Sequence, residues 1–570
     1  MNHIVSEFWK YVHTIRYLKP KQIGYRLFYT LRERYGRKRK QGIRQTGVEA
    51  QWKPVRFAVE PLRYPWIDAR GVEKNEFTFL NETIEFGRRV DWEVPEVGRL
   101  WRYNLHYFQY LFPEENLSRE KSLDLMHHWV AGTPPGTPDA WDPYPISLRL
   151  VNWIKFLSLT PETTPGEYHL PAGSAYLQTQ WLVRSLEYHL LGNHLFRNAK
   201  ALIFSGLFFQ SEEAKDWLHR GLRILDRELE EQILPDGGHF ERSPMYHAMI
   251  LEDVLDLLNL SCASDTVQIR RLEDRLRSKA GQMMTWLLGM THPDGQIALF
   301  NDAAFKIEPE PKSLGDYYRS VTREKPVPPR GLLWAFEKSG YYVLSPSNAD
   351  RMIVDCGPVG PDYQPGHAHS DTLSFELSLR WQRIIVDSGC CRYDHSELRQ
   401  YNRGNQGHNT LTIDGLNQTE VWGAHRTARR ARPMDVRLFM RDRAPSFTGA
   451  HDGYTRLPGK PVHRRTVTWE MNTITIQDTV EGEGEHTIDL RLHLHPEVEV
   501  IIERSKALLT REGVPVATIA AIGLVGVTLV QGWYCPEFGK QLDCPVLAAA
   551  YGKRALPFEC GWKITIVNSD

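Results

Sequence analysis

The sequence contains no run of about 18 apolar residues, the length that a membrane-spanning helix needs. Its first residues also lack the pattern of a signal peptide, in which a basic start precedes an uninterrupted apolar core and a small-residue cleavage site. These absences predict a protein without a transmembrane segment. They make the cytoplasm the default location and leave a periplasmic or secreted one open.

Cysteine motifs are also missing. The seven Cys residues are an odd number and none forms a CxxC pair, which argues against a disulfide framework and against a cysteine zinc site. We therefore expect free, buried thiols. The HExxH pattern of a large class of zinc hydrolases is absent as well.

The chain has no net charge of either sign, because 70 Lys and Arg balance 70 Asp and Glu. A nucleic-acid-binding protein usually has a basic excess, so no nucleic-acid partner is expected. Neutrality does not argue against an anionic polymer as a ligand, since a local basic cleft is enough to attract one. The oligomeric state is not indicated.

The length of 570 residues predicts two or three domains. Residues 1–98 form an N-terminal arm with helical and irregular parts, and its charge run ERYGRKRKQGIR is either a solvated face or a functional basic patch. Residues 99–325 carry apolar residues at three- and four-residue steps, as in ISLRLVNWIKFLSL. Amphipathic helices of this kind stack as hairpins, but periodicity alone does not separate a closed toroid from an open solenoid.

The residue pattern changes after the KPVPPRG linker. Residues 330–570 contain short β-branched and aromatic runs that alternate polar and apolar residues, such as RRTVTWEMNTITIQDTV. This series of closely spaced strands favours an antiparallel β-sandwich. The predicted fold class is therefore a multidomain α+β protein, all-α first and all-β second.

The densest polar cluster is GHAHSDTLSFEL, at what looks like the start of a strand. His367 and His369 alternate there, so their side chains can share one face. His369, Asp387 and His408 have the ligand types of a zinc site. The other interpretation is a set of hydrogen-bonded residues on adjacent strands.

A second cluster lies among the helices. The GNH step places Asn193 and His194 between two apolar stretches, where capping of a helix is the plainer role. The segment GGHFERSPMYH then supplies polar side chains on a glycine-rich turn, which can face a cleft. These side chains are His239, Glu241, Arg242 and Tyr246.

Two further features suit an anionic ligand. Arg149 lies on an otherwise apolar helix near Tyr144, and it needs either an internal partner or a substrate anion. Arg426 and Arg430 belong to a basic stretch that is either a sugar-binding patch or a solvated loop.

The ordered series GNH, GGHFERSPMYH, PDGQIALFNDA and GHAHSD…VDSG…GHNTLTIDG resembles the heparinase II/III family of polysaccharide lyases. The resemblance implies an (α/α) toroid, an incomplete helical barrel, followed by a β-sandwich. It also implies cleavage of uronic-acid polysaccharides by β-elimination. Residues 1–50 look like the arm of family versions found beside bacterial exopolysaccharide genes.

The same resemblance implies the site roles. Tyr246 and His367 would be catalytic, Asn193 or His194 would face the substrate carboxylate, and Asn193 is favoured. The metal would be a structural zinc on His369, Asp387 and His408; no organic cofactor is implied. A phenol is a poor base near neutral pH unless nearby positive charge lowers its pKa, so Tyr246 could act as the base only beside cationic groups.

Two other functions remain open at this point. A uronosyl C5-epimerase would remove the same proton with the same residues and return it to the opposite face. A non-catalytic glycan-binding protein would keep the fold without turnover.

Overall fold

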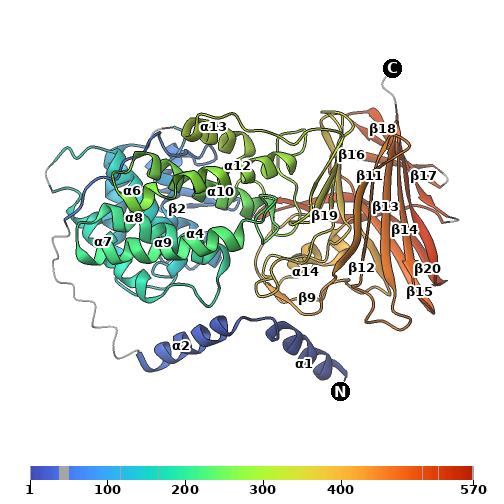
Figure 1. Cartoon of the computed structure of the whole chain (residues 1–570), viewed down its shortest axis with the longest axis horizontal. Coiled ribbons are helices and arrows are strands. Elements are labelled where there is room, and N and C mark those ends of the chain that lie inside the picture. Colours follow the sequence, from blue (N-terminus) through green and yellow to red (C-terminus); the bar gives the residue numbers. More distant parts are fainter. Residues whose placement is uncertain are drawn as a thin grey trace.

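The computed structural model describes residues 2–36, 51–115, 117–164, 166–503, 505–523 and 525–567. It divides into a helical domain and a strand domain that lie end to end (Figure 1). Most of the basic run beginning at Glu33 lies outside the described residues, so its role stays open.

The helical domain is built mainly from antiparallel helix pairs. Its helices are α3 (Ala69–Glu73), α4 (Arg99–Tyr107), α5 (Arg119–Gly132), α6 (Pro143–Leu159), α7 (His169–Arg184), α8 (Gly192–Phe208), α9 (Glu212–Gln232), α10 (Pro244–Ala263), α11 (Val267–Arg270), α12 (Glu273–Gly289) and α13 (Pro311–Thr322). The inner helices α6, α8 and α10 are buried along most of their length. The amphipathic α9 packs against α8 from outside, which is the layering that helical hairpins require.

Residues 51–98, assigned from the sequence to the N-terminal arm, instead pack into the helical domain. Val55, Tyr64 and Trp92 belong to its hydrophobic core. A short hairpin of β1 (Glu76–Phe79) and β2 (Glu82–Glu85) also lies in this segment. The N-terminal arm itself consists of α1 (Asn2–Ile15) and α2 (Pro20–Gly36), which contact the two domains from outside. These two helices lie below both domains in Figure 1.

The strand domain contains three main antiparallel sheets. One sheet has the order β11-β12-β13-β14-β21-β18-β17-β16, the second β19-β20-β15-β8 and the third β3-β4-β5-β6-β7. The strands are β3 (Leu333–Phe336), β4 (Tyr341–Leu344), β5 (Arg351–Asp355), β6 (Phe375–Leu379), β7 (Gln382–Ile385), β8 (Leu411–Ile413), β9 (Val421–Trp422), β10 (Arg426–Thr427), β11 (Pro433–Arg441), β12 (Ala444–His451), β13 (Val462–Glu470), β14 (Thr473–Glu481), β15 (Glu485–His493), β16 (Val498–Glu503), β17 (Lys506–Arg511), β18 (Val514–Ile522), β19 (Thr528–Glu537), β20 (Lys540–Ala555) and β21 (Phe558–Ile566). A small pair, β9 and β10, and the helix α14 (Glu397–Arg403) lie beside them.

Alternation of polar and apolar residues explains the sandwich. In β14, every second residue from Ile474 to Val480 is buried, and their neighbours face outward. The buried faces of the sheets share one core that includes Trp469, Leu490 and Trp562. The expected β-sandwich after a helical domain is confirmed.

Among the described residues, no helix is long and apolar enough to cross a membrane. The seven cysteines are free and six are buried, as expected.

Candidate active site

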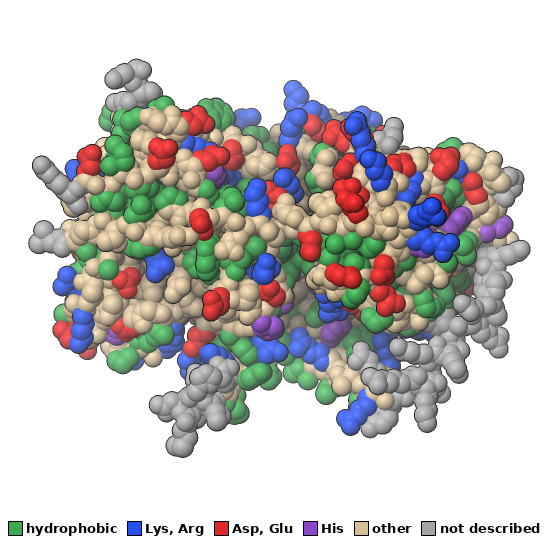
Figure 2. Space-filling model, turned by 180° about the vertical axis from the view of Figure 1, so that it is seen from behind, with side chains coloured by type: hydrophobic (Ala, Val, Ile, Leu, Met, Phe, Trp, Pro, Cys, Tyr) green, Lys and Arg blue, Asp and Glu red, His purple; other side chains and the backbone are tan. Residues whose placement is uncertain are grey.

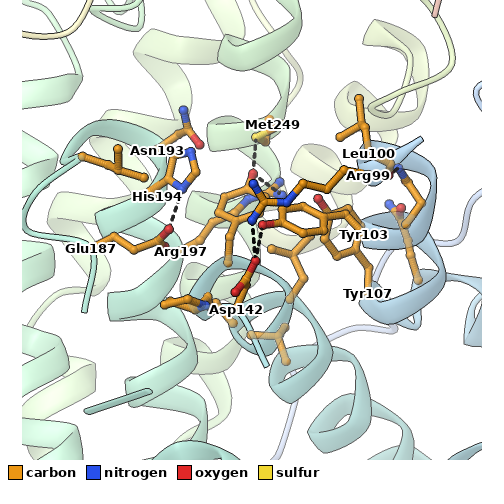
Figure 3. Close-up of a pocket in the computed structure, with 18 of the residues that line it drawn as sticks. Arg99, Leu100, Tyr103, Tyr107, Asp142, Glu187, Asn193, His194, Arg197 and Met249 are labelled. Carbon is orange, nitrogen blue, oxygen red and sulfur yellow. Dashed lines mark hydrogen bonds and ion pairs between the residues drawn. The ribbon is translucent and has the colours of Figure 1, made fainter. Parts of the chain in front are cut away.

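A cavity of about 1250 Å³ opens where the two domains meet. Helices contribute Tyr103, Tyr107, Asp142, Tyr144, Asn193, His194, Arg197 and Tyr246, and the strand domain contributes His367, Tyr393, His425 and Phe538. Figure 3 shows the helical wall, with His194, Arg197 and Tyr103 around the same space. A cavity between domains is a preferred place for a substrate site.

Tyr246 and His367 meet in this cavity from different domains. Their ring centroids are 4.0 Å apart, and the Tyr246 hydroxyl lies 3.0 Å from the Tyr393 hydroxyl. Burial raises the pKa of Tyr246 well above its ordinary value, and Tyr144 adds to the shift. The condition for a tyrosine base, a pKa lowered by nearby cations, is therefore not met, because burial, Tyr144 and two carboxylates all raise the pKa of this phenol.

His367 is oriented by a buried carboxylate. Its Nδ1 lies 2.9 Å from Asp302 Oδ2, and Nε2 of His369 lies 2.9 Å from Asp302 Oδ1. Arg399 donates to the same carboxylate, with Nη2 2.9 Å from Oδ2. Burial by itself would raise the pKa of Asp302, but Arg399 and the two imidazoles hold it well below its ordinary value. A charged Asp302 keeps the proton of neutral His367 on Nδ1 and leaves Nε2 as an acceptor.

The predicted strand start at His367 and His369 is wrong, because β6 begins only at Phe375. The two imidazoles lie in a loop, yet both reach Asp302. Gly366 and the polar residues of this loop give it no strand pattern.

Asn193 does not cap a helix. No side-chain cap bond is present at the start of α8, where Leu191 and Gly192 have positive φ. A Cβ at position 192 would come within 2.5 Å of Glu241 and closer still to Gln364, so glycine lets these side chains approach. Asn193 Nδ2 lies 3.1 and 3.0 Å from the two carboxylate oxygens of Glu241.

This contact still leaves Asn193 able to bind a ligand. The two oxygens of one carboxylate subtend too small an angle to take both amide hydrogens, so they share one N–H. Asn193 is one of the residues that line the cavity, and its second N–H makes no other hydrogen bond among the described residues. Glu241 also lies 3.7 Å from Nε2 of His367, so it connects the two predicted site residues.

His194 is held as a donor by Glu187. Its Nδ1 lies 2.9 Å from Glu187 Oε1, as drawn in Figure 3. Burial opposes the imidazolium, but Glu187 outweighs it and the pKa of His194 is raised. Tyr144 packs against the His194 ring at 4.5 Å, and its hydroxyl accepts from Arg197 Nη1 at 3.0 Å.

The three predicted metal ligands come together. One potential ligand atom from each of His369, Asp387 and His408 lies within 4.8 Å of the others, and all three side chains are buried. His408 Nδ1 is 2.8 Å from Asp387 Oδ2. His369 Nδ1 and His408 Nε2 are buried without a hydrogen-bond partner among the described residues. Unpaired imidazole nitrogens beside a carboxylate fit a metal ion.

Three predicted substrate-binding residues are structural instead. Arg149 is fully buried and donates to Gln178 and to two backbone carbonyls, so its partner is internal. His239 is buried 3.0 Å from Gln232. Arg242 donates to the carbonyls of Phe240, Lys338 and Ser339, which ties the domains together. None of these three arginine and histidine side chains lines the cavity.

Arg426 and Arg430 contact the N-terminal arm and do not line the cavity. The guanidinium of Arg426 lies over the rings of Tyr11 and Trp422. Arg430 lies over Tyr17 and pairs with an Asp362 oxygen at 2.7 Å. The two guanidinium groups thus bind aromatic rings of the N-terminal arm by cation–π contacts. The predicted role of Arg426 and Arg430 in substrate binding is therefore wrong.

Some site residues were missed from the sequence. Asp302 and Tyr393 are central to the geometry, and Glu187 and Arg399 hold other members in place. Asp302 lies within the FNDA stretch of the resemblance, which was the available signal. Tyr393, Glu187 and Arg399 belong to no sequence motif that would identify them as site residues.

Two family models match consecutive parts of the chain: the heparinase II/III N-terminus matches residues 69–321, and the heparinase II/III-like C-terminal model matches residues 328–562. The chain belongs to the heparinase II/III family. Both models leave α1 and α2 outside their matches.

Curated relatives and solved structures agree with this membership. The chain is 28% identical over 314 residues to the heparin-sulfate lyase of Bacteroides stercoris, covering 49% of this chain and 45% of that one. It is 24% identical over 442 residues to that of Bacteroides thetaiotaomicron, covering 67% and 61%. These alignments thus span roughly half of each relative.

Solved structures share the fold. Heparinase III superposes with a TM-score of 0.66 at 19% identity, covering 84% of this chain and 80% of that one. A mutant heparan sulfate lyase from Pedobacter heparinus superposes with 0.61 at 17% identity, covering 88% and 82%. The toroid-plus-sandwich expectation is thereby confirmed.

Proposed function

We propose that this family member is a polysaccharide lyase that cleaves an anionic, uronic-acid-containing polysaccharide by β-elimination. The observation that carries the proposal is the contact between Tyr246 and His367 across the two domains, beside Asn193 and His194. The relatives named as heparin-sulfate lyases support a glycosaminoglycan-like substrate.

The first task of the site is to neutralise charge. Removal of the C5 proton of a uronic acid builds negative charge on its carboxylate, and preorganised donors stabilise that charge. His194 supplies a cation that Glu187 maintains. The free N–H of Asn193 supplies a neutral donor, which the Glu241 contact holds in place.

The second task is acid–base transfer. His367 offers an unprotonated Nε2 because its Nδ1–H donates a hydrogen bond to the Asp302 carboxylate, so His367 suits the base. Glu241, 3.7 Å away, stabilises the imidazolium that results. Tyr246 stays protonated because burial raises its pKa, so it suits the acid that protonates the departing O4.

The test is a panel of uronate polysaccharides, followed by the ultraviolet absorbance of a 4,5-unsaturated product. A lyase gives new absorbance with a uronate polymer and none with a neutral glucan. Incorporation of solvent deuterium at C5 without absorbance would instead identify an epimerase. Binding without either signal would identify a glycan-binding protein.

The His194–Glu187 pair predicts a pH dependence. A raised pKa means that the imidazolium is fully present below the ordinary value of 6.5 and is lost as the pH rises through the raised value. Glu187→Gln removes the stabilising charge, so the alkaline limb of kcat/KM should move to lower pH. The measurement is a pH–rate profile of both proteins.

A matched control for this profile is Asp414→Asn. Asp414 pairs with His486 at 2.7 Å in the strand domain, outside the cavity. Its profile should equal that of the parent protein. An unshifted alkaline limb in Glu187→Gln would refute the role of His194 as the charged carboxylate ligand.

A structural zinc is part of the same proposal. His369 Nδ1 and His408 Nε2, which are buried without a hydrogen-bond partner among the described residues, would hold it together with the Asp387 carboxylate. When bound, zinc supplies a fixed cation that orders its ligands. His369 also contacts Asp302, so this chain's own hydrogen bonds connect the metal ligands to the orientation of His367.

Removal of one ligand should lower both metal content and stability. His408→Ala is expected to lose stoichiometric zinc and to unfold at a lower temperature, because metal binding contributes to folding. His493→Ala is the control, since His493 is equally buried in the strand domain but bonded to Asn409 and Tyr401. Metal analysis and thermal melts are the measurements. Equal, near-zero zinc in the parent protein and both variants would contradict the proposal.

A further inference from the structure

The two helices of the N-terminal arm span the domain junction. Helix α1 contacts the strand domain: the Thr14 hydroxyl lies 3.2 Å from the Thr427 carbonyl oxygen and accepts from Trp422 Nε1 at 3.2 Å. Helix α2 contacts the helical domain through Tyr29, whose hydroxyl donates to the Leu186 carbonyl. The arm lies along one side of both domains in Figure 1.

Helix α2 docks through its polar face. Gln22 is buried and its amide donates to the carbonyls of Leu190 and Tyr363. Arg26 and Arg32 donate to backbone carbonyls of the helical domain. Residues 22, 26 and 29 lie on one side of a helix of 3.6 residues per turn.

The opposite face of α2 is apolar and open. Ile23, Leu27, Phe28 and Leu31 are all exposed, Leu27 by 60%. An amphipathic helix ordinarily buries its apolar stripe and exposes its polar face, so α2 is docked the other way round. This arrangement leaves an apolar stripe that the described residues do not cover.

Helix α1 also carries exposed apolar residues. Phe8, Val12 and Ile15 follow helical spacing and are exposed, Phe8 by 62%. Trp9, an aromatic residue suited to a lipid interface, is exposed beside them. Green and blue side chains lie together along the lower margin of Figure 2, the margin that α1 and α2 occupy in Figure 1.

The charge of the arm identifies its partner. Residues 1–50 contain twelve Lys and Arg but only three Glu, in a chain whose total charge is zero. A second copy of the same basic arm would meet it with like charge. An anionic bilayer matches both the apolar stripe and the basic excess, which together define an interfacial amphipathic helix.

We propose that α1 and α2 dock this protein on the surface of an anionic lipid bilayer, with the exposed apolar residues Phe8, Val12, Ile15, Ile23, Leu27, Phe28 and Leu31 inserted in the interface. The helices lie in the plane of the bilayer and do not span it. The proposal is independent of the reaction that the cavity performs.

The test uses the full chain and sedimentation with vesicles of phosphatidylcholine, with or without phosphatidylserine. The parent protein should bind the phosphatidylserine vesicles at least tenfold more tightly, and added salt should weaken binding because it screens charge. The triple variant Phe8→Glu, Leu27→Glu, Leu31→Glu should reduce that binding at least tenfold. None of these three side chains lines the cavity, whereas Tyr29 and Arg32 of α2 do. Turnover of a soluble substrate should therefore not change while α2 stays docked.

The matched control is Met471→Glu, Val514→Glu, Leu529→Glu, three exposed apolar residues of the strand domain. This control should bind vesicles like the parent protein. Equal binding to both vesicle types, or equal loss in both triple variants, would overturn the proposal. So would a parent dimer that the arm variant converts to a monomer, because the stripe would then be an interface between copies.

Discussion

Asp302→Asn is expected to lower kcat by about 10³- to 10⁴-fold, the scale seen when a buried carboxylate that sets a histidine tautomer is replaced by an amide. Asp302 accepts from His367 Nδ1 in the parent protein. An Asn side chain can donate to Nδ1 instead, which moves the proton to Nε2 and removes the base. The measurement is kcat on the uronate substrate found by the panel screen.

Loss of stability is the effect that must be separated from this result. Asp302 also accepts from Arg399, and removing one partner of a buried ion pair costs about 3–5 kcal/mol. Asp478→Asn is the matched control, because Asp478 is equally buried and accepts from His463 and Arg465. Both variants should lose stability in chemical unfolding, but only Asp302→Asn should lose kcat. Similar kcat values in the two folded variants would contradict the orienting role.

Tyr246→Phe and His367→Ala should each lower kcat by about 10²-fold or more, the usual scale of general acid–base catalysis. The double variant should lower kcat by less than the product of the two single fold decreases, since the two groups act on one transition state. Kinetics with folding checked by circular dichroism are the measurement.

Tyr454→Phe controls for the loss of a buried phenol. The Tyr454 hydroxyl donates to the Leu411 and Leu416 carbonyls inside the strand domain, so its removal should leave kcat unchanged. Near-parental kcat in folded Tyr246→Phe or His367→Ala would defeat the assignment of that residue.

The order of the domains was predictable because it depends on local patterns. Helical spacing marks α6 and α8, and alternation marks β13 and β14. Residues 51–98 were misplaced because they contain little regular structure. Their burial depends on apolar side chains that find partners far along the chain, such as Trp52 stacked on Phe208.

The site was partly predictable for the same physical reason. Motifs located Tyr246 and His367, but no local rule places Asp302 between His367 and Arg399. Arg149 was ambiguous from sequence, because a buried cation satisfied by carbonyls looks like one awaiting an anion. Only the three-dimensional contacts separate these cases.

The location of Asp302 has one more consequence. Its chain segment lies between α12 and α13 of the helical domain, whereas His367, His369 and Arg399 belong to the strand domain. The proton of His367 is therefore held on Nδ1 only while the two domains are in contact, because the base and its carboxylate partner belong to different domains. A molecule that wedged them apart would be an allosteric inhibitor that never enters the cavity, and its effect would fall on kcat before substrate affinity.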